Sequence, residues 1–130
     1  MNKIEIRFVG LGVVVWLAFL ILIRLLGTAV FTIGNPLLPV IFIAAVPMIL
    51  VTIYVVSAIT GVALRDMPIP VFVMTFVALL LDGLSVGFTG LYGETHEQVR
   101  ASSAFLLWGG GLGMVVSLLL AIRQERMGKP

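Results

Sequence analysis

Four long apolar segments constrain the fold of this chain more than any other feature. They cover residues 8–27, 37–64, 69–91 and 102–122. Each has about 20 residues or more, the length that an α-helix needs to cross a hydrocarbon core about 30 Å thick. The apolar runs are continuous and do not alternate with polar residues, which favours helices over the strands of a barrel. The sequence therefore predicts an all-α fold, an integral membrane four-helix bundle formed by residues 1–130 as a single transmembrane domain.

The composition agrees with a bilayer as the main solvent. Of the 130 residues, 61% are hydrophobic and 11% are charged, whereas about a quarter of the residues in soluble domains are charged. The chain has no cysteine and a net charge of +2, so disulfides and thiolate sites are excluded. Its basic residues are scattered near segment ends, which does not indicate a nucleic-acid surface. The expected partner is the lipid bilayer.

The basic residues also indicate how the bundle is oriented. The four spans assign six of them to one side of the membrane and only Arg24 and Arg100 to the other. The six are Lys3, Arg7, Arg65, Arg123, Arg126 and Lys129. Because loops that remain in the cytoplasm carry an excess of lysine and arginine, we predict that both termini are cytoplasmic.

Asp82 is the one charged residue of the segment 69–91. An ionised carboxylate without a partner costs a few kcal/mol or more inside a bilayer, about 3 kcal/mol on insertion scales. Helical spacing puts Thr75, Ser85 and Thr89 on the same face as Asp82. This polar stripe is expected to face the other helices, since the remaining faces are bulky and apolar.

Arg24 is the predicted partner of Asp82. With both termini on one side, the two Cα atoms differ in depth by about 5–8 Å, which a long arginine side chain can bridge. An ion pair between the two is one interpretation; a proton or cation site and a neutral Asp82 bonded to a neighbour are the others. Arg24 can also extend to the outer headgroups.

Two aromatic residues with polar tips lie deep in predicted spans. Trp16 is in the middle of the first span and Tyr54 is well inside the second. Such residues usually find a hydrogen-bond partner within the bundle, here Asp82 or a carbonyl group near Pro47; ordinary packing is the alternative. Tyr92, at the outer end of the third span, is expected to anchor the chain at the membrane surface.

Glycines recur at a spacing that permits close helix contacts. Gly83 and Gly87 in the third span, like Gly109 and Gly113 in the fourth, are separated by three residues. Small residues at this spacing let two backbones approach each other. We expect the third and fourth helices to meet there, with a contact between two copies of the chain as the competing use.

No pattern of catalytic or metal-binding residues stands out. Glu94, His96 and Glu97 fall in one short polar loop, where solvated polarity explains them better than a metal site does. There is no nucleophile–base set and no glycine-rich nucleotide loop. We predict that the protein is not an enzyme and uses no cofactor or metal.

Several short motifs resemble a family of small bacterial four-helix membrane proteins of unknown function. They are the stretch Leu79–Leu84 with Asp82 inside it, the stretch Ala104–Trp108, and Arg24 near the end of the first span. The resemblance covers nearly the whole chain and implies a bacterial cytoplasmic (inner) membrane location. It carries no activity. The outer loop Glu94–Arg100 is charged, whereas a more proline-rich loop is expected from that family's pattern.

Two classes of function are consistent with these features. The first is a structural or accessory subunit that packs as a homodimer or within a larger membrane complex, as its small size and glycine-rich faces indicate. The second is a small transporter or channel for a proton or cation, in which Asp82 is the key carboxylate and a dimer encloses the pathway.

Overall fold

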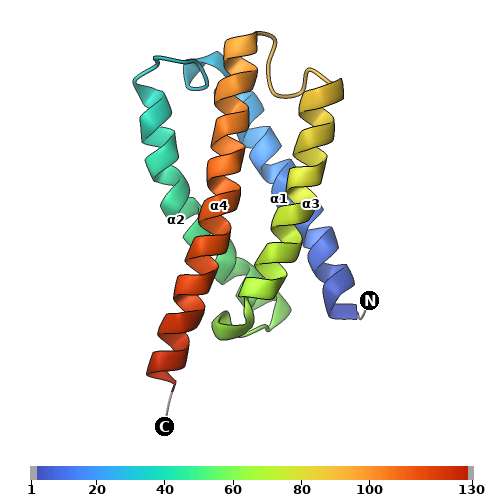
Figure 1. Cartoon of the computed structure of the whole chain (residues 1–130), viewed down its shortest axis with the longest axis vertical. Helices are drawn as coiled ribbons and strands as arrows, with labels where there is room; N and C mark the ends of the chain where they lie inside the picture. Colours follow the sequence, from blue (N-terminus) through green and yellow to red (C-terminus); the bar gives the residue numbers. More distant parts are fainter. Residues whose placement is uncertain (1–2, 129–130) are drawn as a thin grey trace.

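The structure is a computed structural model that describes residues 3–128, and the side chains from residue 6 onward. Four long helices form the chain: α1 (Lys3–Leu26), α2 (Leu37–Thr60), α3 (Pro68–Phe88) and α4 (His96–Met127). Two 3-10 helices, η1 (Gly27–Ala29) and η2 (Leu64–Asp66), lie between them (Figure 1). The described residues contain no strand, and all four helices are long and apolar enough to cross a membrane. The all-helical, membrane-compatible fold is therefore confirmed.

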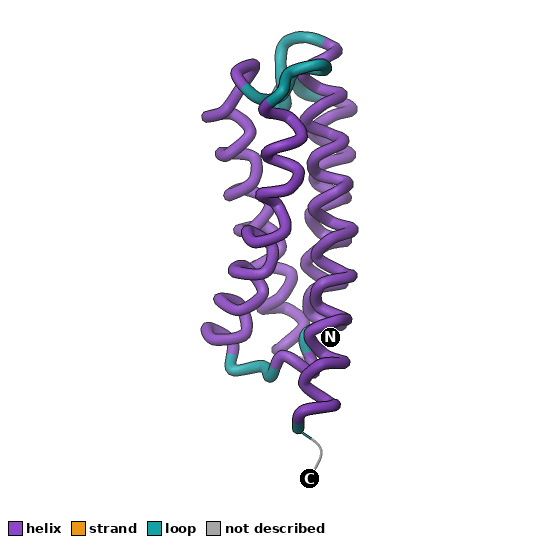
Figure 2. Tube along the Cα trace, turned by 90° about the vertical axis from the view of Figure 1, so that its left-hand side faces the viewer, coloured by secondary structure: helices purple, strands orange, loops and turns teal. Residues whose placement is uncertain are grey.

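The four helices run roughly along one axis, and both ends of the described chain lie at the same end of the bundle (Figure 1). The α2–α3 turn is at this end as well, while the α1–α2 link and the α3–α4 loop are at the other (Figure 2). Helix α3 packs against α1 and α4, and α2 packs against α4. Among the basic residues assigned to the end with the termini, Lys129 and the side chain of Lys3 lie outside the described residues.

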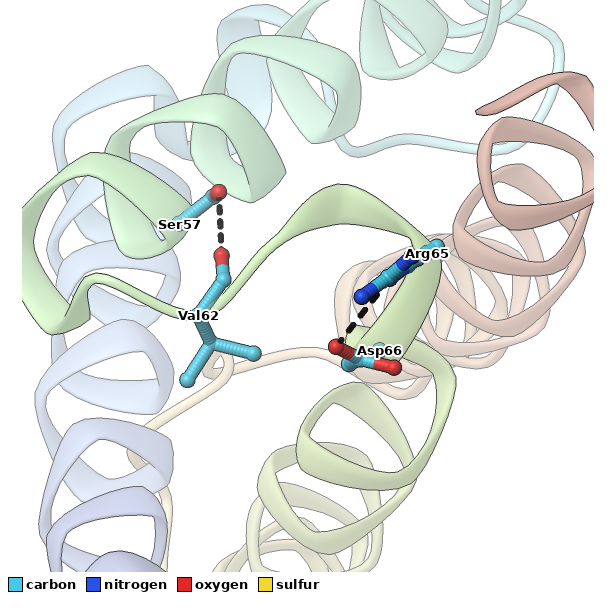
Figure 3. Close-up of polar contacts among 4 residues, drawn as sticks. All are labelled: Ser57, Val62, Arg65 and Asp66. Carbon is cyan, nitrogen blue, oxygen red and sulfur yellow. Dashed lines mark hydrogen bonds and ion pairs between the residues drawn. The ribbon is translucent and has the colours of Figure 1, made fainter. Parts of the chain in front are cut away.

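Helix α2 ends at Thr60, earlier than the predicted span, because the next residue leaves the helical conformation. Gly61 adopts a left-handed conformation with φ of 73°, and its N–H donates to the Ser57 carbonyl over 2.9 Å. This is the usual way for a glycine to terminate a helix. The Ser57 hydroxyl then donates to the Val62 carbonyl over 2.6 Å and holds the turn (Figure 3).

Helix α4 begins at His96, several residues before the predicted span. The reason is an N-cap: the Thr95 hydroxyl accepts a hydrogen bond from the Gln98 N–H over 3.1 Å. At the other side of the same loop, α3 ends at Phe88 and Thr89 is extended. The connection between α3 and α4 is thus only seven residues, 89–95.

Two buried clusters fill the bundle, one toward each end. The cluster near the α2–α3 turn contains Phe8, Ile49, Ile53, Val56, Met67, Val71, Met74 and Leu120. The cluster at the other end contains Leu20, Ile23, Val30, Phe31, Ala45, Tyr92, Ala101 and Phe105. Outside these clusters the helices carry many exposed apolar side chains, with Leu25 and Phe88 each at least 80% exposed. Such a surface suits contact with lipid tails, which are as apolar as leucine.

Helices α1 and α3 approach each other tightly at Gly12 of α1. A Cβ atom on Gly12 would lie 3.0 Å from both the Cα and the carbonyl oxygen of Met74 in α3. Real Cβ atoms rarely come so near to a neighbouring backbone, so only glycine fits without a shift of one helix. Trp16 is one helical turn further along α1, on the same face as Gly12. The absence of a side chain at Gly12 therefore helps to bring Trp16 against α3.

Candidate functional site

Asp82 accepts hydrogen bonds from two aromatic side chains. The Trp16 indole N–H donates to Asp82 Oδ1 over 2.8 Å, and the Tyr92 hydroxyl donates to the same oxygen. The Trp16 N–H also reaches the Tyr92 hydroxyl oxygen at 2.8 Å, so its hydrogen is shared between two acceptors. Asp82 Oδ2 accepts no hydrogen bond from the residues that the structure describes. One carboxylate oxygen is thus fixed by the protein and the other is left for a further partner.

Three different parts of the chain supply this network. Trp16 comes from α1, Asp82 lies six residues before the end of α3, and Tyr92 belongs to the loop that follows. The loop is held in turn by α4, because the buried Ser102 hydroxyl donates to the Tyr92 carbonyl over 3.1 Å. Tyr92 is only 1% exposed. The tyrosine predicted to anchor the chain at the membrane surface is instead enclosed by the bundle.

The environment of Tyr92 keeps its hydroxyl in the neutral form. Burial is the main cause that raises the pKa of Tyr92 well above its ordinary range, and the hydrogen bond and charge of Asp82 act in the same direction. Both causes disfavour a second negative charge beside the carboxyl group, while the Trp16 N–H opposes them in part. Tyr92 is therefore a hydrogen-bond donor to Asp82 at ordinary pH.

The predicted pair of Asp82 and Arg24 is not formed. Arg24 is exposed and donates to the Leu91 carbonyl over 3.4 Å, at the end of the bundle away from the termini. Within the described part of the chain, the one ion pair closer than 4.0 Å joins Arg65 Nε and Asp66 Oδ2 at 3.7 Å in η2 (Figure 3). Asp82 instead has two neutral donors, one of which, Trp16, lies on the same helix as Arg24.

The polar stripe divides into three environments. Thr75 lines the central cavity together with Asp82, and Ser85 is buried. Thr89 lies at the end of α3, where its hydroxyl donates to the Ser85 carbonyl over 2.5 Å. The part of the stripe from Thr75 to Ser85 faces the bundle, whereas Thr89 closes the helix end on an exposed surface.

The two deep aromatic residues also lie in different environments. Trp16 has its partner in Asp82. Tyr54 is 46% exposed on the outer surface of α2, and its hydroxyl makes no hydrogen bond with the described residues. An aromatic contact that the sequence did not suggest comes from Trp108 of α4, which donates to the Phe42 carbonyl of α2 over 2.9 Å. That carbonyl is one residue before the one that loses its N–H partner to Pro47.

The four predicted packing glycines do not meet one another. Atoms built as Cβ on Gly83, Gly87 or Gly109 would contact nothing within 4 Å. Gly113 is buried and faces α3, where a Cβ would lie 3.8 Å from Val71 and 3.9 Å from Thr75. The α3–α4 contact therefore pairs a glycine of α4 with branched side chains of α3, and Gly83 and Gly87 are exposed.

A cavity of about 90 Å³ lies between the four helices. Its walls are almost entirely apolar, and Asp82 is the one charged side chain that lines it among the described residues. The residues that line it together with Asp82 include Trp16, Phe19, Ala78, Leu79, Phe105 and Leu106. At about 30 Å³ per liquid water molecule, the volume equals about three waters or one small organic group.

Two parts of this site were not evident from the sequence. Tyr92 follows Asp82 by ten residues across the end of a helix, and only the short α3–α4 loop returns it to the bundle. Gly12 precedes Trp16 by one turn on α1, and a glycine one turn before a deep tryptophan is the signal that could have identified the α1–α3 contact.

The polar loop residues Glu94, His96 and Glu97 are exposed, and the described residues hold no group of three or more side chains that could bind a metal.

Comparisons with known proteins found no protein-family model, no curated protein and no solved structure that matches this chain.

Proposed function

We propose that the protein is a small transporter or channel of the bacterial cytoplasmic membrane, in which Asp82 takes up a proton or a cation. The observation that carries this proposal is the position of Asp82 on the wall of an apolar cavity, bonded to two neutral donors and to no basic side chain among the described residues. Neutral donors orient a carboxylate but leave its negative charge uncompensated. A charge in that position calls for a proton or a cation, since an unpaired one costs several kcal/mol.

The arrangement of the basic residues supports an orientation with both termini in the cytoplasm. Arg7, Arg65, Arg123 and Arg126 belong to helix ends that meet at the end of the bundle with the termini (Figure 1). Under the positive-inside rule this end is cytoplasmic. Asp82, about 9 Å from the end of α3 at 1.5 Å per residue, then lies in the outer half of the membrane.

Proton movement into liposomes that contain the purified protein tests the proposal. Internal pH is followed while protons are driven first by a potassium diffusion potential, then by outward gradients of sodium or tetramethylammonium. The test variant is Asp82→Asn, which retains an acceptor oxygen for Trp16 and Tyr92. Asp66→Asn is the matched control, because Asp66 is an exposed aspartate in η2, paired with Arg65. We expect Asp82→Asn to reduce the flux to that of empty liposomes and Asp66→Asn to retain it. Equal flux in both variants, or no flux above empty liposomes under every gradient, would contradict the proposal.

A structural or complex-associated subunit is the second candidate, and one observation favours it. Gly83 and Gly87 form a small-xxx-small pair on an exposed surface of α3, with open space where their side chains would be. Such a pair suits a contact with another membrane helix, including that of a second copy. The two candidates are compatible if a dimer is the transporting unit.

Chemical crosslinking in mild detergent tests this contact. Gly83→Leu should abolish a crosslinked dimer, while Gly10→Leu should not, because Gly10 is an exposed glycine of α1 with nothing within 4 Å. A dimer that survives Gly83→Leu and Gly87→Leu, or a protein that is monomeric throughout, would exclude this surface as the contact.

A further inference from the structure

A second hollow adjoins the central cavity on the side of the bundle between α1 and α2. This groove has a volume of about 510 Å³ and is lined by Ala18, Phe19, Leu22, Pro47, Met48, Val51 and Thr52. Phe19 and Thr52 also line the central cavity, so the two hollows share part of their walls. In the described residues, α1 approaches α2 less closely than it approaches α3, although side chains of α1 and α2 meet in both buried clusters. The groove therefore borders the central cavity at Phe19 and Thr52.

The chemistry of the cavity selects among cations. A metal ion requires several oxygen ligands in place of its hydration shell, and this cavity offers one carboxylate among apolar side chains. An organic ammonium group has apolar substituents and needs only one counter-charge. Aromatic rings also attract such groups through their negative faces, and Trp16, Phe19 and Phe105 line the cavity.

Resting on the function proposed above, we propose that the cation bound at Asp82 is an amphiphilic organic cation that enters from the bilayer through the α1–α2 groove. Its alkylammonium head occupies the central cavity, where Asp82 Oδ2 is free of other partners among the described residues. Its apolar tail lies in the groove and in the adjoining lipid. The lipid-exposed groove supplies the tail with an apolar surface, and the carboxylate supplies the head with its counter-ion.

Binding of decyltrimethylammonium to the protein in phosphatidylcholine nanodiscs tests the proposal directly. The chain has two tryptophans, so Trp108→Phe leaves Trp16, on the cavity wall, as the single fluorescent indole. We expect saturable changes in Trp16 fluorescence with decyltrimethylammonium. The neutral analogue, which has a tert-butyl head, should give no saturable change. Sodium ions alone should give none either. Decylphosphocholine distinguishes a lipid headgroup from a free cation, and its phosphate should weaken binding because it brings a second anion toward Asp82.

Two pairs of variants assign the head and the tail to their positions. In the Trp108→Phe background, Asp82→Asn should weaken binding at least about tenfold, as loss of a charge-assisted contact predicts, and Asp82→Glu should restore part of it. Val51→Phe should slow association about severalfold by filling the groove. Val55→Phe should not, since Val55 is an exposed valine one turn away that lines neither hollow.

The outcomes separate this inference from the function on which it rests. If the neutral analogue binds as tightly as the cation, or if Asp82→Asn does not weaken binding, the organic-cation site is refuted even where Asp82-dependent proton flux persists. If decyltrimethylammonium binds through Asp82 but no flux depends on this residue, the site stands and the transport function fails. Equal effects of Val51→Phe and Val55→Phe would refute entry through the groove.

Discussion

Trp16 of α1 donates its indole N–H to the Asp82 carboxylate of α3 over 2.8 Å, one helical turn from Gly12, where the two helices approach tightly. Tyr92 donates to the same carboxylate oxygen from the loop that α4 holds in place. The carboxylate therefore links three parts of the chain, although no basic side chain of the described residues pairs with it. A group that is costly in lipid is stabilised by neutral donors, which leaves its charge available for a ligand.

The Trp16–Asp82 bond predicts energetic coupling between these two positions. In a double-mutant cycle with Trp16→Phe and Asp82→Ala, the double variant should lose less stability than the sum of the single variants, by about 0.5–3 kcal/mol. Unfolding in detergent, followed by circular dichroism, gives the four free energies. Trp108→Phe is the matched control, because its indole donates to the Phe42 carbonyl instead. Its cycle with Asp82→Ala should be additive to within about 0.5 kcal/mol. Equal coupling of both tryptophans to Asp82 would contradict the assigned bond.

The tight approach at Gly12 predicts that even a methyl group there lowers the stability of the protein. Gly12→Ala places a methyl group 3.0 Å from backbone atoms of Met74, which should destabilise the protein by about 1–3 kcal/mol through overpacking. Gly10→Ala is the control, since a Cβ there contacts nothing within 4 Å. It should leave stability unchanged or raise it by up to about 1 kcal/mol, because alanine is the better helix former. A similar thermal midpoint for the two variants would mean that α1 and α3 separate without cost.

Tyr92 predicts a loss of stability at high pH. Its pKa is raised in the folded state, mainly by burial and next by Asp82, so the unfolded chain releases a proton that the folded chain retains. Stability from this group is fully present below about pH 10, the ordinary pKa of tyrosine, and is lost as the pH rises further. Thermal unfolding of the wild type should show this loss, and Tyr92→Phe should lack it. In a Tyr54→Phe background, where Tyr92 is the single tyrosine, ultraviolet absorbance reports its ionisation directly. Identical pH profiles for the wild type and Tyr92→Phe would exclude this explanation.

The sequence was sufficient for the coarse fold because the bilayer imposes it. Apolar runs of membrane-spanning length permit only helices or closed barrels, and the continuous pattern decided between the two. The ends of the helices depended on local chemistry instead. Gly61 terminates α2 and Thr95 begins α4 through single hydrogen bonds, and neither residue interrupts the hydropathy pattern enough to fix the boundary.

The candidate site could be predicted only in part, since periodicity assigns a residue to a face but not to a partner. The spacing of Thr75 and Asp82 assigns both to one face of the helix, and both line the central cavity. Which residue of α1 reaches Asp82 depends on packing, because the small size of Gly12 brings α1, and with it Trp16, against α3. Tyr92 was unpredictable for a related reason, because a loop residue has no periodic signal to show that it turns inward.

Removing the Arg24 side chain distinguishes the ion pair suggested by the sequence from the contacts in the structure. Breaking a buried ion pair by removing one partner costs about 3–5 kcal/mol, because the other charge is left uncompensated. Arg24 is exposed and its bond to the Leu91 carbonyl is long, at 3.4 Å, so Arg24→Gln should cost less than about 1 kcal/mol. Arg100→Gln, an exposed arginine in the first turns of α4 at the same end of the bundle, is the control and should behave alike. Free energies of unfolding in detergent decide whether Arg24 pairs with Asp82. A loss of several kcal/mol in Arg24→Gln alone would indicate that the pair is formed. The uncompensated charge on which the proposed cation site depends would then be absent.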